Sequence, residues 1–177
     1  MTRHQFTLDD VLDLISQGMI SKRVQLLGGE IYNMPADGYR HQKYAIALNK
    51  LFTTKLAATP ATVAMQTTLR MSAFEGPSPD LFVLAGSLPE HEVPADEILV
   101  VIEVADSSLR FDLGDAAIRY AVHGVCEYWV IDVNTPCIYV HCDPVNGAYP
   151  PPQKIDAATP ISARLIPDVS VRLADIA

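Results

Sequence analysis

The sequence has little of several features that would mark a secreted or membrane protein. Its 177 residues include three cysteines and one tryptophan, and no apolar run approaches the roughly 18 residues that a membrane span needs. The first residues contain no apolar segment of signal-peptide type, so we expect neither export nor membrane association, and a cytoplasmic location. The low, odd cysteine count also fits a reducing compartment.

Positive charge is scarce as well. The chain has 13 lysines and arginines against 21 aspartates and glutamates, a formal net charge of −8. Such a total argues against tight electrostatic binding to nucleic acid, because phosphate contacts come mainly from lysine and arginine. A local stripe of cationic side chains could offset this net negative charge, since Arg40, Lys43 and Lys50 follow one another at near-helical spacing. An ordinary solvated helix face is the alternative interpretation.

Two apolar runs each carry one carboxylate. Asp80 follows a proline and opens the run Leu81–Leu84, whereas Glu103 interrupts the run Ile98–Ala105. Both alternating sets of the second run are apolar, which predicts a strand covered on both faces. A buried ionised carboxylate must be paired, hydrogen-bonded or bound to a cation, and carboxylate oxygens suit a hard divalent ion. We therefore predict that Asp80 lies beside the middle of the neighbouring strand and forms a metal site with Glu103.

A structural role is the alternative for both acids. Asp80 would then cap the turn that precedes it, and Glu103 would pair with Arg110 or Arg119. The residues alone leave both interpretations open.

Further motifs follow these two acids in a fixed order along the chain. They are Asp112-Leu-Gly, Tyr120-Ala-Val-His-Gly124 and Glu127-Tyr-Trp-Val-Ile-Asp132, with Leu26–Ile31, Met34-Pro35 and His41 upstream and Ile166–Val169 and Leu173–Asp175 downstream. Together with Pro79-Asp80 and Glu103-Val104, this order resembles the Uma2 family of endonucleases, which belongs to the PD-(D/E)XK nuclease superfamily. The resemblance covers nearly the whole chain.

The resemblance implies one α/β domain over residues 1–177, with a restriction-endonuclease-like core in which helices flank a mixed sheet. It also implies hydrolysis of DNA phosphodiester bonds with Mg²⁺ as cofactor and Mn²⁺ as a substitute. Asp80 and Glu103 would be the metal ligands. DNA is the expected partner, and a homodimer is left open.

The family lysine is absent from both places where the resemblance predicts it. In the usual E-x-K pattern it would stand at Ala105, and in Uma2-like sequences it follows an aspartate by four residues, which leads from Asp112 to Ala116. Two further family acids are also replaced, since Gln25 stands where glutamate is usual and Gly28 where aspartate is usual. Loss of one pre-organised charge would lower the cleavage rate by about two to three decades.

Two other residues are candidates for the site. Arg119 shares a helix face with Ala116 and could neutralise phosphate charge, although arginine cannot act as a base. The alternative for Arg119 is a surface ion pair with Asp112 or Asp115. His41 matches a histidine usual in the family and would contact the metal site, a phosphate or a leaving group. Its alternative is a hydrogen bond at a helix terminus.

The predicted elements place these residues along the chain. Thr7 and Asp10 have capping-box spacing for a first helix that ends near Gly18, and Asp112 and Asp115 have it for a third helix that ends at Gly124. Tyr120, Tyr128 and Trp129 are expected to pack in the core. The other predicted elements are a helix over His41–Leu56 and strands over Arg23–Leu27, Glu30–Asn33, Val63–Met71, Pro79–Leu84, Ile98–Ala105, Tyr128–Val133 and Ile138–Cys142.

Two functions follow from the sequence. The first is a DNA endonuclease, active or weakened, in which Arg119 replaces the missing lysine. The second is a catalytically inactive member that keeps the nuclease fold as a binding module for nucleic acid or protein.

Overall fold

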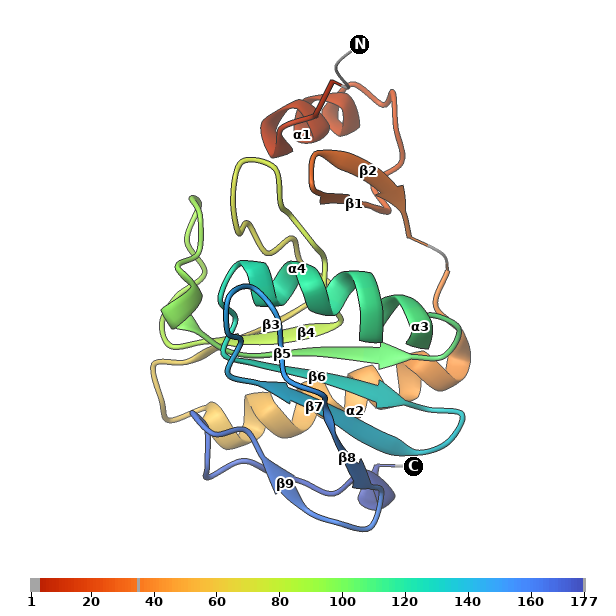
Figure 1. Cartoon of the computed structure of the whole chain (residues 1–177), viewed down its shortest axis with the longest axis vertical. Helices are drawn as coiled ribbons and strands as arrows, with labels where there is room; N and C mark the ends of the chain where they lie inside the picture. The colour runs from red at the N-terminus through yellow and green to blue at the C-terminus, as the bar shows by residue number, and fades with distance from the viewer. Residues whose placement is uncertain (1–3, 35, 177) are drawn as a thin grey trace.

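A six-stranded mixed sheet forms the centre of the computed structural model, which describes residues 4–34 and 36–176 (Figure 1). The strand order is β3-β4-β5-β6-β7-β8, with β5 and β6 parallel and the other neighbours antiparallel. The strands are β3 (Thr62–Met65), β4 (Leu81–Leu84), β5 (Ile98–Ala105), β6 (Glu127–Asp132), β7 (Cys137–Cys142) and β8 (Gln153–Asp156). This sheet, with helices on both faces, is the α/β architecture that the sequence predicts.

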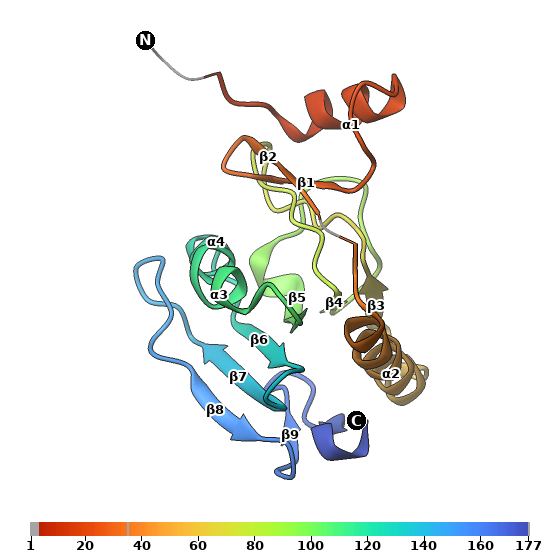
Figure 2. The same cartoon turned by 90° about the vertical axis from the view of Figure 1, so that its right-hand side faces the viewer.

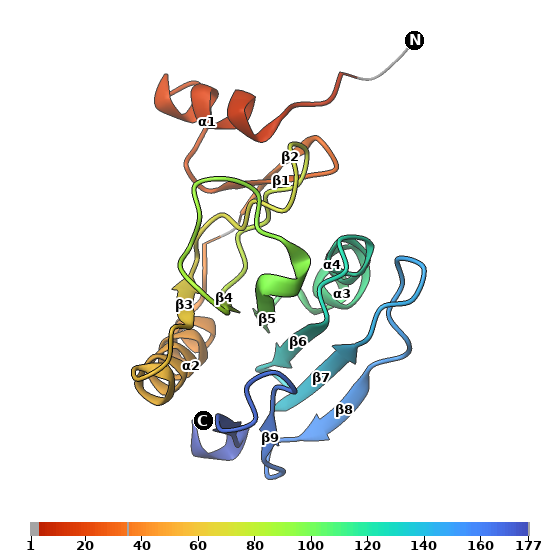
Figure 3. The same cartoon turned by 90° about the vertical axis from the view of Figure 1, so that its left-hand side faces the viewer.

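Helices cover the two faces of the sheet because its inner strands are apolar on both sides (Figure 2 and Figure 3). Helix α2 (Tyr39–Leu56) packs with Val100, Ile102 and Val104 of β5. The opposite face of β5 packs with a continuous helical segment made of α3, a π-helical turn and α4. These three parts are α3 (Leu109–Phe111), the π turn (Asp112–Ala116) and α4 (Ala117–Val122). Within the described part of the chain, no helix combines the length and apolar character needed to cross a membrane.

The N-terminal segment forms a separate small layer, drawn above α4 in Figure 1. Helix α1 (Leu8–Ser16) begins at the predicted capping box, in which the Thr7 hydroxyl accepts from the Asp10 N–H and the Asp10 carboxylate accepts from the Thr7 N–H. The hairpin of β1 (Val24–Leu27) and β2 (Glu30–Asn33) follows. Its turn requires glycine, because Gly28 and Gly29 have φ of 60° and 76°.

The C-terminal segment completes the core on the α2 side of the sheet. Strands β9 (Ile161–Ser162) and β10 (Ser170–Val171) pair with each other, and a 3₁₀ turn (Leu173–Asp175) follows. Buried residues of this segment, including Val169 and Leu173, join the cluster that contains α2. Another 3₁₀ turn (Ala95–Glu97) precedes β5. The sequence did not predict β8, β9 and β10, which are short or half-exposed and lack a clear apolar pattern.

Two predicted boundaries are wrong. The strand predicted over Val63–Met71 ends at Met65, because Gln66 takes a φ of 48° and turns the chain away from the sheet. The helix predicted to begin at Asp112 begins at Leu109. Asp112 is therefore a buried residue inside the helical segment instead of its cap.

Candidate active site

The register of β4 and β5 brings Asp80 and Glu103 together. Leu81 lies opposite Ile102 in this antiparallel pair, so Asp80 is placed next to Glu103 at the start of β4. The Asp80 N–H donates to Glu103 Oε2 at 3.1 Å, and the Val104 N–H donates to Asp80 Oδ2 at 2.8 Å. The juxtaposition that the sequence predicts for these two acids is thus present.

His41 reaches the same place from the first turn of α2. Its Nε2 lies 2.8 Å from Asp80 Oδ2, and its side chain is buried. Burial by itself lowers the pKa of His41, but the hydrogen bond and charge of Asp80, helped by Asp37 and Asp106, outweigh burial and raise that pKa. His41 Nδ1 is buried without a hydrogen-bond partner among the described residues.

Asp112 supplies a third carboxylate that the sequence did not assign to the site. The π turn carries it onto the face of β5 where Glu103 lies, and the Ser108 hydroxyl donates to its Oδ2 at 2.5 Å. Burial, and then repulsion from Asp80, raise the pKa of Asp112 to about 6, although the bond from Ser108 opposes the shift. The signal that could have found it was its place in the Asp-Leu-Gly motif, two turns before Arg119.

Tyr120 holds the other side of Glu103. Its hydroxyl donates to Glu103 Oε1 at 3.0 Å, while the ring is buried against the sheet as predicted. Burial, and then the charges of Asp80 and Asp112, raise the pKa of Glu103 well above its usual range. The site is therefore crowded with negative charge that the surrounding residues only partly neutralise.

These residues line a cavity of about 500 Å³, called here the acidic pocket. Its walls come from the β1–β2 hairpin, the start of α2, the residues just before β4, the end of β5 with the loop after it, and the helical segment that begins with α3. The carboxylates that line it are those of Asp37, Asp80, Glu103, Asp106 and Asp112. No lysine or arginine belongs to this lining among the described residues.

Arg119 lies outside the acidic pocket. Its Nη1 donates to Glu75 Oε1 at 2.9 Å, and Glu75 Oε1 also accepts from the Gly28 N–H at 2.7 Å. The surface ion pair predicted with Asp112 or Asp115 is therefore wrong, because the partner of Arg119 is Glu75 on the buried loop before β4.

The oxygen-rich donor set fits a hard divalent cation. Three carboxylates converge, and Asp80 Oδ1 accepts no hydrogen bond from the described residues, whereas Asp80 Oδ2 accepts two. Negative charge that raises carboxylate pKa values is the charge that such a cation would neutralise. In residues 4–34 and 36–176, no three or more His, Cys, Asp or Glu side chains lie close enough together to hold a metal ion. A cation held by all three carboxylates would therefore require these side chains to move.

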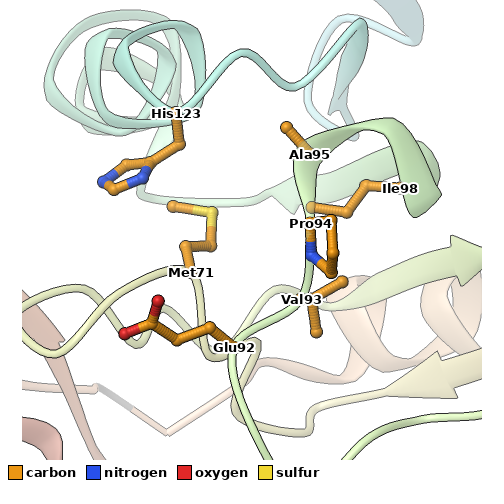
Figure 4. A pocket seen from close by; sticks show the side chains of 7 residues that line it. All are labelled: Met71, Glu92, Val93, Pro94, Ala95, Ile98 and His123. Carbon is orange, nitrogen blue, oxygen red and sulfur yellow. The ribbon is translucent and has the colours of Figure 1, made fainter.

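A second cavity of about 320 Å³, whose lining side chains are drawn in Figure 4, shares no lining residue with the acidic pocket. Met71, Val93, Pro94, Ala95 and Ile98 line it together with Glu92 and His123, which are its ionisable groups. One carboxylate and one imidazole do not form the oxygen-rich set found in the acidic pocket.

Comparison with known proteins agrees with this fold. The family model for Uma2, described as "Putative restriction endonuclease", matches residues 11–174. The chain belongs to the Uma2 family. A solved structure described as a "putative nuclease belonging to DUF820", from Anabaena variabilis ATCC 29413, aligns with a TM-score of 0.72 and 13% identity over 97% of each chain. A search of curated proteins finds no match.

These findings confirm the predicted family and fold. Ala105 and Ala116, the two positions where the Uma2 resemblance predicts a lysine, belong to one buried cluster on the Glu103 face of β5. A lysine from either position would approach the site over the same face. In this Uma2 protein both positions hold a methyl group.

Proposed function

We propose that this Uma2 protein is a metal-dependent endonuclease that hydrolyses DNA phosphodiester bonds. Asp80 and Glu103 would hold Mg²⁺, with Mn²⁺ as a substitute, and Asp112 would complete the donor set. The observation that carries the proposal is the convergence of these three carboxylates in one cavity, where burial and mutual repulsion raise the pKa of Glu103 and of Asp112. Membership of a nuclease family supports the same chemistry.

The chain's own residues prepare these carboxylates. His41 and the Val104 N–H hold Asp80 through Oδ2, which leaves Oδ1 available to a ligand. Tyr120 and the Asp80 N–H hold the two oxygens of Glu103. A bound divalent ion would supply an activated water and neutralise phosphate charge. His41 is proposed to act through Asp80, because its raised pKa favours the protonated imidazole beside that carboxylate.

The missing lysine is proposed to weaken this enzyme. Arg119 would add positive potential near the site, but it would not orient water, because its guanidinium is bound to Glu75 and does not line the acidic pocket. We therefore expect cleavage slower by about two to three decades than in a site with a pre-organised lysine.

A second candidate function is a nuclease fold that binds nucleic acid or a protein without cleaving. The observation that favours it is the pair of alanines at both lysine positions, with no lysine or arginine lining the acidic pocket among the described residues. Metal-dependent cleavage by the purified protein, abolished by Asp80→Ala, would exclude this function.

Calorimetric titration with Mn²⁺ tests the metal site without a guess about substrate. We expect binding by the wild type, loss of binding in Asp80→Asn, and retention in Asp96→Asn, whose exposed carboxylate lies in the turn before β5. Equal heats in all three proteins would mean that the ion binds elsewhere. No binding with or without DNA present would favour the non-cleaving function.

Cleavage of plasmid DNA in Mg²⁺ then tests the reaction. We expect wild-type protein to cleave slowly and Glu103→Gln to lose this activity, because the amide keeps the shape of the side chain but removes the charged ligand. Cleavage by Glu103→Gln at the wild-type rate would refute the assignment of the site.

A further inference from the structure

One segment of this acidic chain contains no acidic residue. Of its 21 aspartates and glutamates, none lies between Asp37 and Glu75. Helix α2 occupies the first half of that interval and carries Arg40, Lys43, Lys50 and Lys55. The net negative charge of the protein therefore coexists with one helix whose charged residues are cationic.

Two of these cationic residues lie on the side of α2 that faces away from the sheet. Its buried positions include Tyr44, Leu48 and Phe52, which pack against the sheet. Lys43 and Lys50 lie on the opposite side, because positions seven apart are two turns along the same face. Between them on the same line is Ile46, and one turn before Lys43 lies Tyr39, which is 88% exposed.

The lysines of this face differ from most arginines of the protein in their partners. Arg23, Arg70, Arg119, Arg164 and Arg172 each form an ion pair with an aspartate or glutamate. In the described part of the chain, neither Lys43 nor Lys50 has a carboxylate within ion-pair distance. Their charge is available to an external anion.

The same helix leads into the acidic pocket. Gly38 at its N-cap and His41 in its first turn line that cavity, and His41 contacts Asp80. Arg40, on the flank of the helix, donates to Asn134 Oδ1 at 3.1 Å. Figure 2 shows α2 beside β3 and β4, on the face of the sheet opposite α3 and α4.

We propose that the outward face of α2, defined by Tyr39, Lys43, Ile46 and Lys50, binds the phosphate backbone of nucleic acid and aligns a strand with the acidic pocket. The inference deepens the proposed nuclease function and rests on it. The argument for it is charge complementarity. The phosphate backbone is a polyanion that needs cationic partners, and the acidic pocket offers only carboxylates, whereas the outward face of α2 offers lysines. Tyr39 provides an exposed ring on which a base can stack.

The composition of this face favours nucleic acid over an anionic membrane. A membrane-surface helix needs a broad apolar side facing the lipid, whereas the apolar side of α2 is already buried against the sheet. Outward, the helix continues beyond Lys50 with the exposed hydroxyl side chains of Thr53 and Thr54. Backbone recognition of a nucleic acid requires no such apolar side.

Equilibrium binding, measured without divalent ions, tests this proposal independently of cleavage. Fluorescence anisotropy of a labelled DNA duplex and of its single strand would be followed between about 50 and 200 mM salt. The test variant is Lys43→Gln/Lys50→Gln. The matched control is Lys22→Gln/Lys154→Gln, which removes the same charge from exposed positions before β1 and on β8.

We expect the α2 variant to bind about tenfold to a hundredfold more weakly at 0.1 M salt, with a log–log salt slope smaller by about two. The control variant should keep the wild-type slope. Equal losses in both variants, unchanged binding in the α2 variant, or no DNA binding by the wild type would each overturn the proposal. Stronger lysine-dependent binding to phosphatidylserine vesicles than to DNA would also overturn it.

A cleavage assay on the same variants distinguishes failure of this inference from failure of the proposed function. Loss of binding in the α2 variant, beside a wild type that binds but never cleaves, would support the docking face and refute the nuclease. Cleavage by the wild type with unchanged binding and rate in the α2 variant would support the nuclease and refute the docking face.

Discussion

The carboxylates of the acidic pocket are held by N–H and O–H donors and by one imidazole. Backbone N–H groups bind one oxygen each of Asp80 and Glu103, and the Tyr120 hydroxyl binds the other oxygen of Glu103. At the scale of single residues, the chain therefore orients its acids but lacks the lysine charge that the family resemblance places at Ala105 or Ala116. Ala116, buried on the Glu103 face of β5, is the position at which one residue could restore that charge.

The substitution Ala116→Lys is expected to raise the rate of DNA cleavage in Mg²⁺ by about two to three decades, because it returns a pre-organised positive charge to the site. Plasmid nicking measures the change, and a thermal melt checks that the variant folds. Ile118→Lys is the matched control, since its side chain is exposed on the same helix. A similar gain in both variants would point to general electrostatic attraction of DNA instead.

At the scale of elements, one buried carboxylate connects the N-terminal hairpin to helix α4. Glu75 accepts from the Gly28 N–H in the hairpin turn and from Arg119 Nη1 on the helix. The approach is close, because a Cβ on Gly28 would lie 2.6 Å from Arg119 Nη1. The hairpin forms a wall of the acidic pocket, so this connection positions residues such as Tyr32 beside the carboxylates of the pocket.

Removing Arg119 should loosen that connection. Arg119→Ala is expected to lower the free energy of unfolding by about 1–3 kcal/mol, because Glu75 is left buried without its ionic partner. Urea denaturation measures the loss, and Arg119→Ala/Glu75→Gln should lose less than the sum of the single variants. Arg172→Ala breaks an exposed pair and should lose under about 1 kcal/mol. Equal losses in the two arginine variants would contradict the role of Glu75 as a connector.

At the scale of the whole molecule, the acidic pocket makes stability depend on pH. Asp112, with its pKa raised to about 6, binds a proton in the folded state at pH values where the unfolded chain has released it. The stability that this proton contributes is present below the ordinary pKa of 3.8 and is lost as pH rises through about 6. The raised pKa of His41 acts in the same direction.

Melting temperatures with and without Mg²⁺ should therefore diverge as pH rises. Above about pH 6 the ionised carboxylates can bind the ion, which adds roughly 2.7 kcal/mol at a hundredfold excess over Kd. Below that pH protons compete and the difference should shrink, and Asp112→Asn should reduce it throughout. A shift in melting temperature that is the same near pH 5 and pH 8 would contradict a carboxylate site.

The predictable part of this protein rests on local patterns. The capping box at Thr7 and Asp10 forms as its spacing requires, and the apolar runs around Asp80 and Glu103 form neighbouring strands. An acid inside an apolar strand has few acceptable environments, so its presence already indicated a partner. The two strands could be predicted without knowing which group that partner is.

The sequence by itself determined the family, the α/β class and the pairing of Asp80 with Glu103, because strand periodicity and burial are written in neighbouring residues. Only the tertiary structure decided that Asp112 and Tyr120 lie near Glu103 and that Arg119 pairs with Glu75. Those contacts depend on the π turn and on the packing of α4 over the sheet. A shift of one residue in a helix rotates a side chain by about 100°, and nothing in the local sequence sets that rotation.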